Sequence, residues 1–269
     1  MDIKRLLTGF IGLPIIIAIL VLSNTYIFDI IIAIVAFIMM DEYCRSFPKE
    51  KAKPIKWISY ISCIFIAFMH VIPSEHMYLA FTSVIVVLII ALFLNVIISK
   101  LKLNIIDIAV TFFGIFYIVF LISFVSKLRG ADNGRLLVWY IFLAAWGTDT
   151  MAYFIGRYFG KHKISEISPK KTVEGCVAGT LGAIIFVLVY TFIINKFLGM
   201  DINYYVISGL ALIWSIIGQL GDLSESTLKR YTGIKDSSNL LPGHGGMLDR
   251  FDSVIFIAPF AYILLIMIN

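Results

Sequence analysis

The stretch MYLAFTSVIVVLIIALFLNVII, residues 77–98, contains no charged side chain. A helix of this length is long enough to cross the ~30 Å hydrocarbon core of a bilayer. Similar apolar runs recur along the chain, and none shows the alternation of polar and apolar residues typical of a transmembrane barrel strand. The sequence therefore predicts an all-α integral membrane protein with about nine transmembrane helices, over 6–23, 25–40, 55–72, 77–98, 105–126, 136–156, 176–195, 202–220 and 253–268.

The composition supports this class of protein. Hydrophobic residues make up 60% of the 269-residue chain and charged residues only 14%, which is far from a soluble domain. Lys4 and Arg5 precede the first apolar run, as in a signal peptide, but no small-x-small cleavage pattern follows Ser23. We therefore expect a retained first helix. The three scattered cysteines predict neither a zinc site nor a disulfide framework.

The positive charges predict the orientation of the chain. With nine helices and a cytoplasmic N-terminus, all but four of the 22 Lys and Arg residues fall on the cytoplasmic side. The C-terminus then lies outside a bacterial-type cell membrane. The net charge of +5 forms a one-sided coat against anionic lipid head groups, so it does not indicate nucleic-acid binding. The four outer cations are Lys127, Arg129, Arg135 and Lys196.

The polar residues divide the chain into two regions. Residues 1–126 form about five transmembrane helices with basic, functionally plain connections such as DEYCRSFPKEKAKPIK. Residues 127–269 form a C-terminal catalytic region whose polar residues gather in cytoplasmic loops 157–175 and 221–252. Among the carboxylates within apolar runs, Asp29 and Asp107 lie near helix ends, from which their side chains are expected to reach the membrane interface.

A deeper carboxylate begins a polar stripe. Asp149 is followed by Tyr153 and Arg157 at i+4 and i+8, which places the three side chains on one helical face directed toward the cytoplasmic loop. An intramembrane carboxylate is by default a functional candidate.

The segment GDLSESTLKRYTGIKD carries a second polar face. A helix continuing from residue 220 places Asp222, Glu225, Ser226 and Lys229 on one side, followed by Arg230. Carboxylates and cations together suit a site that holds a metal ion and a phosphate. An ordinary solvated amphipathic turn is the alternative interpretation.

The segment LLPGHGGMLDRFDS, residues 240–253, interrupts the apolar pattern before the last helix. Its glycines exclude a helix and allow backbone N–H groups to form an anion-binding nest around His244. Asp249 and Asp252 follow at the expected start of the last helix, with Arg250 between them. Such oxygen ligands favour hard cations such as Mg²⁺.

The loop GKHKISEISPKKTVEG supplies further cations. Pro169 suits the first position of a helix, and Lys170 and Lys171 would then flank a helix N-terminus, where phosphate binds well. The alternative is that these lysines serve only to set the orientation of the chain in the membrane. Together the three segments predict phosphoryl or nucleotidyl transfer onto a lipid. No Walker A pattern is present to couple ATP hydrolysis to transport.

The same segments carry a resemblance to a known family. SESTLKRYTGIKDSSNLLPGHGGMLDRFDS resembles the signature of phosphatidate cytidylyltransferases, the CDP-diacylglycerol synthases. The upstream segment is also similar to the family, and the resemblance covers residues 147–253. The signature positions are Ser226, Leu228, Lys229, Arg230, Lys235, Asp236, Pro242, His244, Gly245, Gly246, Asp249, Arg250 and Asp252.

The resemblance implies that CTP and phosphatidate react to give CDP-diacylglycerol and pyrophosphate, with Mg²⁺ and room for a second cation. It implies Asp222 and Asp249 as metal ligands, and we add Asp252 as a third candidate. We expect catalytic roles for Asp222, Ser226, Lys229, Arg230 and Asp249. We expect phosphate binding by Arg157, Lys170, Lys171, Lys235, His244, Gly245, Gly246 and Arg250.

The expected partners are CTP, phosphatidate and membrane lipids, without nucleic acid, and a homodimer is left open. A CTP-dependent polyprenol kinase would need many of the same residues, so it is the nearest alternative function. An ion-coupled transporter is a more distant one, because its essential acidic groups would lie near the bilayer midplane rather than in cytoplasmic loops.

Overall fold

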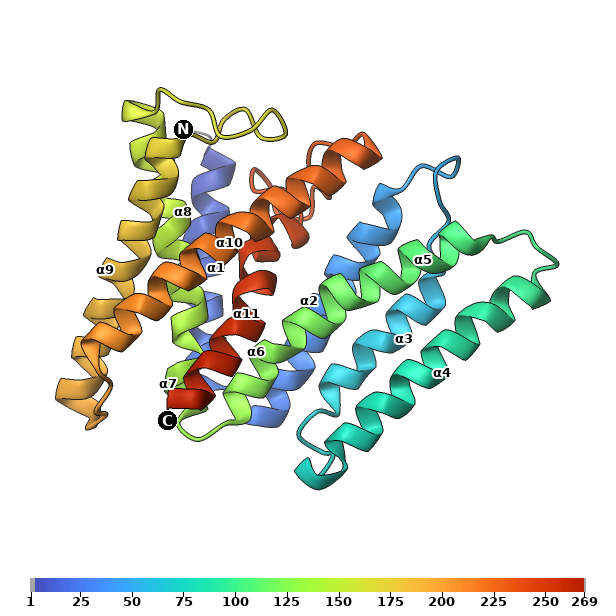
Figure 1. Cartoon of the computed structure of the whole chain (residues 1–269), viewed down its shortest axis with the longest axis horizontal. Helices are drawn as coiled ribbons and strands as arrows, with labels where there is room; N and C mark the ends of the chain where they lie inside the picture. The colour runs from blue at the N-terminus through green and yellow to red at the C-terminus, as the bar shows by residue number, and fades with distance from the viewer. Residues whose placement is uncertain (1–2, 269) are drawn as a thin grey trace. The chain divides into compact units, whose positions relative to one another are not determined.

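The computed structural model describes residues 3–268, with side chains for residue 10, residues 12–73 and residues 75–267 (Figure 1). These residues form helices and no strand. Two isolated β-bridges, Lys163 with Thr172 and Leu241 with Gly245, occur in loops. The predicted all-α class is confirmed, and each of the nine predicted apolar runs overlaps a helix of the described chain.

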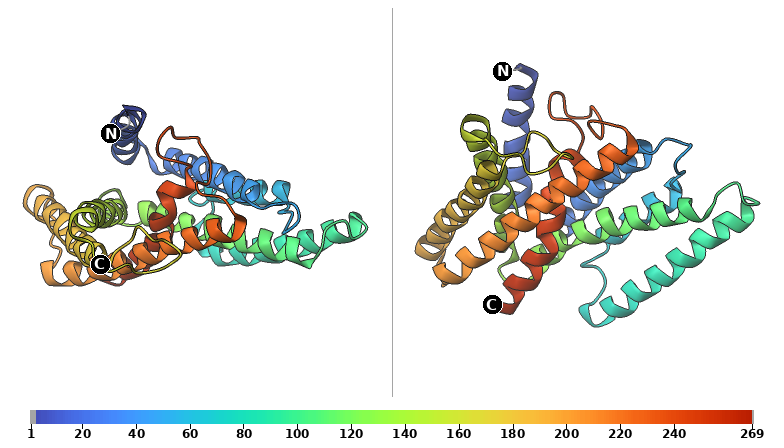
Figure 2. Two further views of the ribbon diagram at one scale, coloured as in Figure 1. Left: turned by 90° about the horizontal axis from the view of Figure 1, so that it is seen from above. Right: turned by 45° about the horizontal axis from the view of Figure 1, so that its top comes forward.

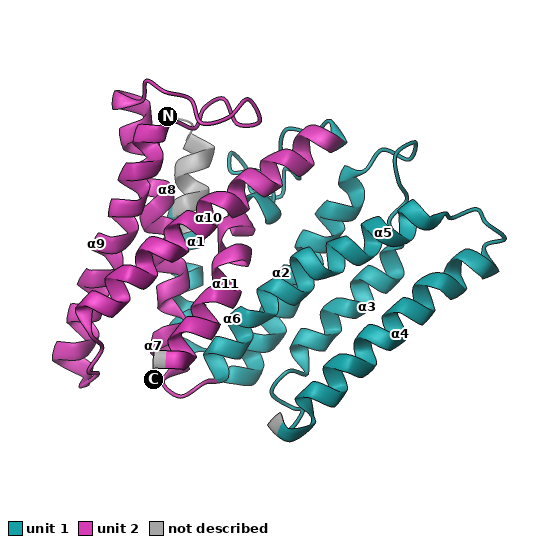
Figure 3. Cartoon of the chain, in the orientation of Figure 1, with its two compact units in different colours: residues 1–130, 232–250 teal, residues 131–231, 251–269 magenta. Residues whose placement is uncertain are grey.

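The chain divides into two compact units (Figure 3). The first unit comprises residues 1–130 and 232–250, and the second comprises residues 131–231 and 251–269. The loop that carries the glycine-rich segment therefore belongs with the N-terminal helices, although it lies late in the sequence.

The first unit contains six α-helices, a short 3₁₀-helix and a π-helical segment. Asn24 begins α2 by accepting a hydrogen bond from the amide of Ile27 at 2.8 Å. Tyr43 of α2 reaches across to donate to the carbonyl of Val110 at 2.9 Å. The elements are α1 (Ile3–Leu22), α2 (Thr25–Ser46), α3 (Lys56–Ala67), η1 (Ser74–His76), α4 (Met77–Ile98), α5 (Ile105–Gly114), the π-helix η2 (Ile115–Phe120) and α6 (Leu121–Gly130).

Two intramembrane carboxylates of the first unit are satisfied internally. Asp29 is fully buried, with Oδ2 2.7 Å from Nδ1 of His70. Asp107 is also buried and accepts from the amides of Lys53 at 2.6 Å and Asn104 at 2.9 Å, forming a capping box at the start of α5. Donors from neighbouring segments therefore satisfy both carboxylates within the protein, and their expected reach to the membrane interface stays a prediction.

The second unit is built on closely packed long helices. Figure 2 shows α8 and α9 running side by side. Gly175, Gly179 and Ala183 recur at four-residue intervals on α9, and a methyl group on Gly179 would lie 2.8 Å from the carbonyl oxygen of Thr148. Small residues at this spacing allow membrane helices to approach closely. The elements are α7 (Gly134–Leu137), α8 (Trp139–Phe159), α9 (Val173–Leu198), α10 (Tyr204–Thr232) and α11 (Leu248–Ile268).

Five segments of the described chain are long and apolar enough to cross a membrane: Met77–Ile98, Ile105–Gly130, Val173–Leu198, Tyr204–Thr232 and Leu248–Met267. The two expected polar loops are shorter than their predicted ranges. The first contains residues 160–172, because α8 continues to Phe159. The second contains residues 233–247, because α10 keeps its helical hydrogen bonds to Thr232.

Candidate functional site

The glycine-rich loop of the first unit forms a closed turn. The amide of Leu241 donates to the carbonyl of Gly245 at 2.9 Å, and the amide of His244 donates back to Leu241 at 2.8 Å. Gly243 and Gly245 have φ angles of +78° and +82°, a region that side chains with a Cβ rarely adopt. The predicted absence of a helix here is confirmed, and the glycines are needed for the turn.

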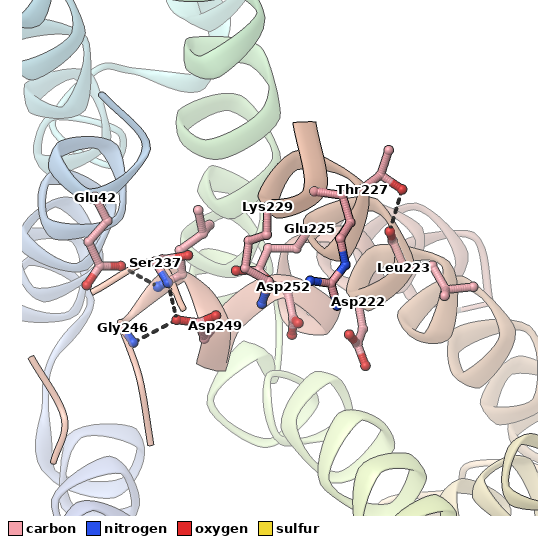
Figure 4. Close-up of polar contacts among 12 residues, drawn as sticks. Glu42, Asp222, Leu223, Glu225, Thr227, Lys229, Ser237, Gly246, Asp249 and Asp252 are labelled. Atoms are coloured by element: carbon pink, nitrogen blue, oxygen red, sulfur yellow. Dashed lines mark hydrogen bonds and ion pairs between the residues drawn. The ribbon is translucent and has the colours of Figure 1, made fainter. Parts of the chain in front are cut away.

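Asp249 holds the two ends of this loop together. Its Oδ2 accepts hydrogen bonds from the amide of Ser237 at 2.8 Å and the amide of Gly246 at 2.7 Å (Figure 4). Asp249 lies in the first turn of α11 and is only 8% exposed. These two hydrogen bonds fix the loop against the start of the helix.

Glu42 of α2 is the second carboxylate on this loop. Only 4% of Glu42 is exposed. Its Oε1 accepts from Ser238 Oγ at 2.6 Å and from the amide of Met247 at 2.9 Å, while Oε2 accepts from the amide of Leu248 at 2.8 Å. Glu42 thereby satisfies N–H groups at the N-terminus of α11, where a negative charge is also favoured by the helix dipole.

Glu42 was absent from the residues that the sequence singled out. Its segment was expected to be functionally plain, yet the structure shows it holding the glycine-rich loop. The available signal was a carboxylate at the end of the apolar run 25–40, which resembled many interfacial acids. Its three donors lie about 200 positions further along the chain, so spacing alone does not reveal them.

The other residues predicted in and just after this loop differ in exposure. Lys235 and Arg250 are exposed, His244 is partly exposed, and Gly246 is buried. A methyl group on Gly246 would lie 2.7 Å from both carboxylate oxygens of Glu42, so this position requires glycine. The amide of Gly246 donates to Asp249. Phosphate binding by His244, Gly245, Gly246, Lys235 and Arg250 stays a prediction.

In the second unit, α10 carries the predicted polar face. Asp222, Glu225, Ser226 and Lys229 lie on this one helix, as expected, and the fully buried Glu225 forms an ion pair with Lys229. The pair lies within the helix at i and i+4, so the charge of a deeply buried carboxylate is compensated locally.

Asp252 of α11 joins this polar face. It is 8% exposed, and Asp222, Glu225 and Asp149 lie close enough to interact with it electrostatically. Figure 4 shows Asp222, Glu225, Lys229 and Asp252 gathered together. Gly221 allows this approach, because a methyl group there would lie 2.5 Å from the carbonyl oxygen of Asp252. The second unit thus gathers four carboxylates, of which Glu225 is paired with Lys229 and Asp222 with Lys171.

One lysine of the loop 160–172 contacts the same helix, α10. Lys171 Nζ lies 2.5 Å from Asp222 Oδ2, with 21% and 30% of the two side chains exposed. Arg230 Nε donates to the carbonyl of Ile167 at 3.1 Å, which ties the loop to α10. Lys170 is exposed. The structure therefore brings Lys171 to Asp222 and ties the loop to Arg230, while the roles expected of these residues in the reaction stay predictions.

The polar stripe on α8 is also formed. Arg157 Nη1 donates to the hydroxyl of Tyr153 at 2.8 Å, one turn away, and the guanidinium lies 6.0 Å from the ring centroid. Asp149 and Arg157 are both exposed on this helix.

The start of α9 differs from its prediction. Pro169 lies in a turn, and the helix begins at Val173 with Thr172 as its cap, accepting from the amide of Gly175 at 3.1 Å. The expectation that Pro169 begins a helix is wrong. The loop instead folds back, since Val173 donates its amide to the carbonyl of His162 at 2.9 Å. This pairing holds Lys171 just before the helix.

The described residues include no group of three or more His, Cys, Asp or Glu side chains arranged to hold a metal ion. Asp222 contacts Lys171, and Asp249 contacts loop amides. A metal ion shared by these two aspartates stays a prediction. The chemistry of the donors nevertheless fits a hard divalent cation, because the candidate ligands are carboxylate oxygens.

Comparison with known proteins defines the family. The sequence model of the cytidylyltransferase family matches residues 3–268, so the chain belongs to this family. The chain is 42% identical over 171 residues to the phosphatidate cytidylyltransferase of Staphylococcus haemolyticus (strain JCSC1435). It is 41% identical over 171 residues to that of Staphylococcus aureus (strain COL).

The same name is given to a Bacillus subtilis (strain 168) relative, which is 42% identical over 151 residues. The matched segments cover 63% of this chain and 64% of each staphylococcal relative, and 55% of both chains for the Bacillus relative. The chain thus spans just under two thirds of the length of the staphylococcal relatives. None of these names supports a polyprenol kinase or a transporter.

Proposed function

We propose that this chain is a phosphatidate cytidylyltransferase, which makes CDP-diacylglycerol and pyrophosphate from CTP and phosphatidate during phospholipid synthesis. The family supports transfer of a cytidylyl group, and the names of the relatives support phosphatidate as the acceptor. The observation that carries the proposal is the ion pair between Lys171 and Asp222. It places a cation that can bind phosphate beside a carboxylate that can bind a metal ion, the two kinds of group that such a transfer uses.

The reaction needs positioning and charge neutralisation more than acid–base chemistry. An oxygen of the phosphatidate phosphate attacks the α-phosphorus of CTP, forming a new P–O bond. The bond from the α-phosphorus to the oxygen bridging to the β-phosphorus breaks, and pyrophosphate leaves with that electron pair. Lys171, Lys229 and Arg230 would stabilise charge on the phosphate oxygens, which is the largest contribution that a preorganised site makes.

We further propose Mg²⁺ as the resident cation, with Asp222 and Asp249 as its ligands and Asp252 as a third. When bound, it would neutralise phosphate charge and favour the departure of pyrophosphate. Repulsion among the carboxylates around Asp252 supports a cation in the second unit. The brace from Asp249 Oδ2 to two loop amides orients that side chain, which suits a ligand whose position must be fixed.

The proposed enzyme crosses a bacterial cell membrane nine times, with a cytoplasmic N-terminus and the site facing the cytoplasm. The asymmetry of lysines and arginines supports this orientation. Single cysteines introduced at exposed Lys51 and Lys196 test it, after Cys44, Cys63 and Cys176 are replaced by serine. An impermeant maleimide should label the cysteine at position 196, but not the one at position 51, in intact cells.

An assay with two differently labelled CTP samples tests the function. Purified protein in lipid nanodiscs should convert phosphatidate and α-labelled CTP to labelled CDP-diacylglycerol, with stoichiometric pyrophosphate. With γ-labelled CTP and a polyprenol, no labelled polyprenyl phosphate should form. Labelled polyprenyl phosphate without CDP-diacylglycerol would overturn the proposal in favour of the kinase alternative.

A further inference from the structure

A groove lies on the second unit between the start of α9 and the middle of α10, and residues of the loop 160–172 also line it. Its cavity volume is about 290 Å³, close to the lower limit for ligand pockets. The walls are mainly apolar and include Val177, Ile216 and Leu220. One cation, Lys171, lines the same groove. A site with one charged end and a long apolar wall fits an amphipathic anion.

The apolar wall faces outward from the described unit. Val177 of α9, and Ile216 and Leu220 of α10, are all exposed. Both helices are long and apolar enough to cross a membrane. Lipid chains are therefore the surroundings that these side chains would meet, and a groove between them is open to a chain entering sideways.

The inner wall is polar but uses its donors within the protein. Gln219 Nε2 lies 3.3 Å from the carbonyl of Cys176 and 3.2 Å from Thr180 Oγ1 and Ser215 Oγ. Thr148 and Ser215 extend the network between α8 and α10 at 2.9 Å. This network joins three helices behind the groove, so it fixes the shape of the wall rather than binding a head group.

Lys171 has donors for a ligand at the mouth of the groove. An ammonium carries three N–H donors, and the ion pair with Asp222 uses one of them. Because its side chain is only 21% exposed, a phosphate there would be poorly screened by water. A phosphate on Lys171 would also be held beside the acidic face of α10.

We propose that this groove binds a phosphate-headed membrane lipid, with its phosphate on Lys171 and an acyl chain along Val177, Ile216 and Leu220. Under the proposed function, on which this last assignment rests, that lipid is the acceptor phosphatidate entering from the bilayer. The groove then selects a membrane-embedded acceptor over a soluble phosphate.

Photolabelling of the full chain in nanodiscs tests the binding directly. The probe is phosphatidate with a diazirine in its acyl chain, and the control is diacylglycerol with the same chain. We expect phosphatidate to label Val177, Ile216 or Leu220 about tenfold more than diacylglycerol does, since only the former offers a phosphate to Lys171. Equal labelling by the two probes, or labelling confined to other helices, would overturn the inference.

Filling the groove gives an independent test. Val177→Trp should raise the KM for a long-chain phosphatidate about tenfold, as expected when roughly two methylene groups are kept out of the groove. The KM for CTP should stay unchanged. Val189→Trp, at an exposed position further along α9 outside the groove, is the matched control and should behave as wild type.

A soluble dihexanoyl phosphatidate distinguishes chain binding from phosphate binding. Its KM should differ between Val177→Trp and wild type by less than about twofold, because a short chain buries little apolar surface. Equal effects on short and long substrates would contradict a chain-binding groove. Wild-type protein that is labelled in the groove but makes no CDP-diacylglycerol would disprove the proposed function alone. Active protein without groove labelling would disprove only this inference.

Discussion

Glu42 Oε2 accepts a hydrogen bond from the amide of Leu248 at 2.8 Å, joining residues that are 206 positions apart. With Ser238 and Met247, this bond makes one buried carboxylate the common acceptor for both ends of the glycine-rich loop. Glu42 therefore acts as a positioning residue, whose effect on any reaction would pass through the loop that it holds.

Replacing Glu42 should destabilise the loop. Glu42→Ala leaves two backbone N–H groups and a hydroxyl without their acceptor, so we expect a loss of at least about 3 kcal/mol in unfolding free energy. Glu42→Gln keeps one acceptor and should lose less. Thermal unfolding and proteolysis of residues 233–247 measure both effects. Glu50→Ala, at an exposed position, is the control, and equal melting of the two alanine variants would exclude the brace.

Gly246→Ala should conflict with the same carboxylate. The added methyl group would lie 2.7 Å from both oxygens of Glu42, so the loop must move, at a cost of about 1–3 kcal/mol. In a double-mutant cycle, Glu42→Ala should relieve much of this cost, giving a non-additive result. Gly209→Ala, where nothing lies within 4 Å, should be neutral or stabilising. Strict additivity between the two loop substitutions would contradict the contact.

Asp222→Asn should separate catalysis from stability. The ion pair with Lys171 is partly exposed, so its loss should change the unfolding free energy by less than about 1 kcal/mol. The rate of CDP-diacylglycerol formation should fall at least about 100-fold, because a proposed ligand of the cation and the partner of Lys171 is lost. Asp201→Asn, an exposed acid before α10, provides the comparison. Near-normal turnover of the Asp222 variant would show that Asp222 has no role in the reaction.

Divalent cations should stabilise the wild-type chain without any substrate. At Mg²⁺ concentrations about tenfold above its dissociation constant, binding adds about 1.4 kcal/mol to the unfolding free energy. The melting temperature should therefore rise with Mg²⁺ and fall back with chelator. Asp222→Asn and Asp252→Asn should lose this response, whereas Glu166→Gln, in the exposed loop, should keep it. If Mg²⁺ raised the melting temperature of all four proteins equally, Asp222 and Asp252 would not be its ligands.

The helices were predictable because the membrane imposes a strong pattern. The run at 77–98 became α4 with the predicted bounds, since apolar length alone defines such a helix. The face carrying Asp222, Glu225, Ser226 and Lys229 was also predicted, because helical periodicity is local. The resemblance extended this to a family, which the match over residues 3–268 confirmed.

The long-range partners were not predictable. The sequence pattern did not reveal that His70 and the amide of Lys53 would hold Asp29 and Asp107, because these partners lie 41 and 54 positions away. Pro169 suits a helix start, yet Thr172 supplies the cap and α9 begins at Val173. There one local preference outweighed another, and the amide of Val173 is also held by the carbonyl of His162.

The brace on Glu42 also has a consequence for the biogenesis of the chain. Ribosomes release the N-terminal helices first, and a buried carboxylate without donors is unfavourable. All three donors to Glu42 lie at Ser238, Met247 and Leu248, so they emerge only with the final helix. A nascent chain cut short before that helix keeps an unsatisfied acid among its apolar segments. Stable burial of Glu42 among the N-terminal helices therefore has to wait until synthesis has reached Leu248.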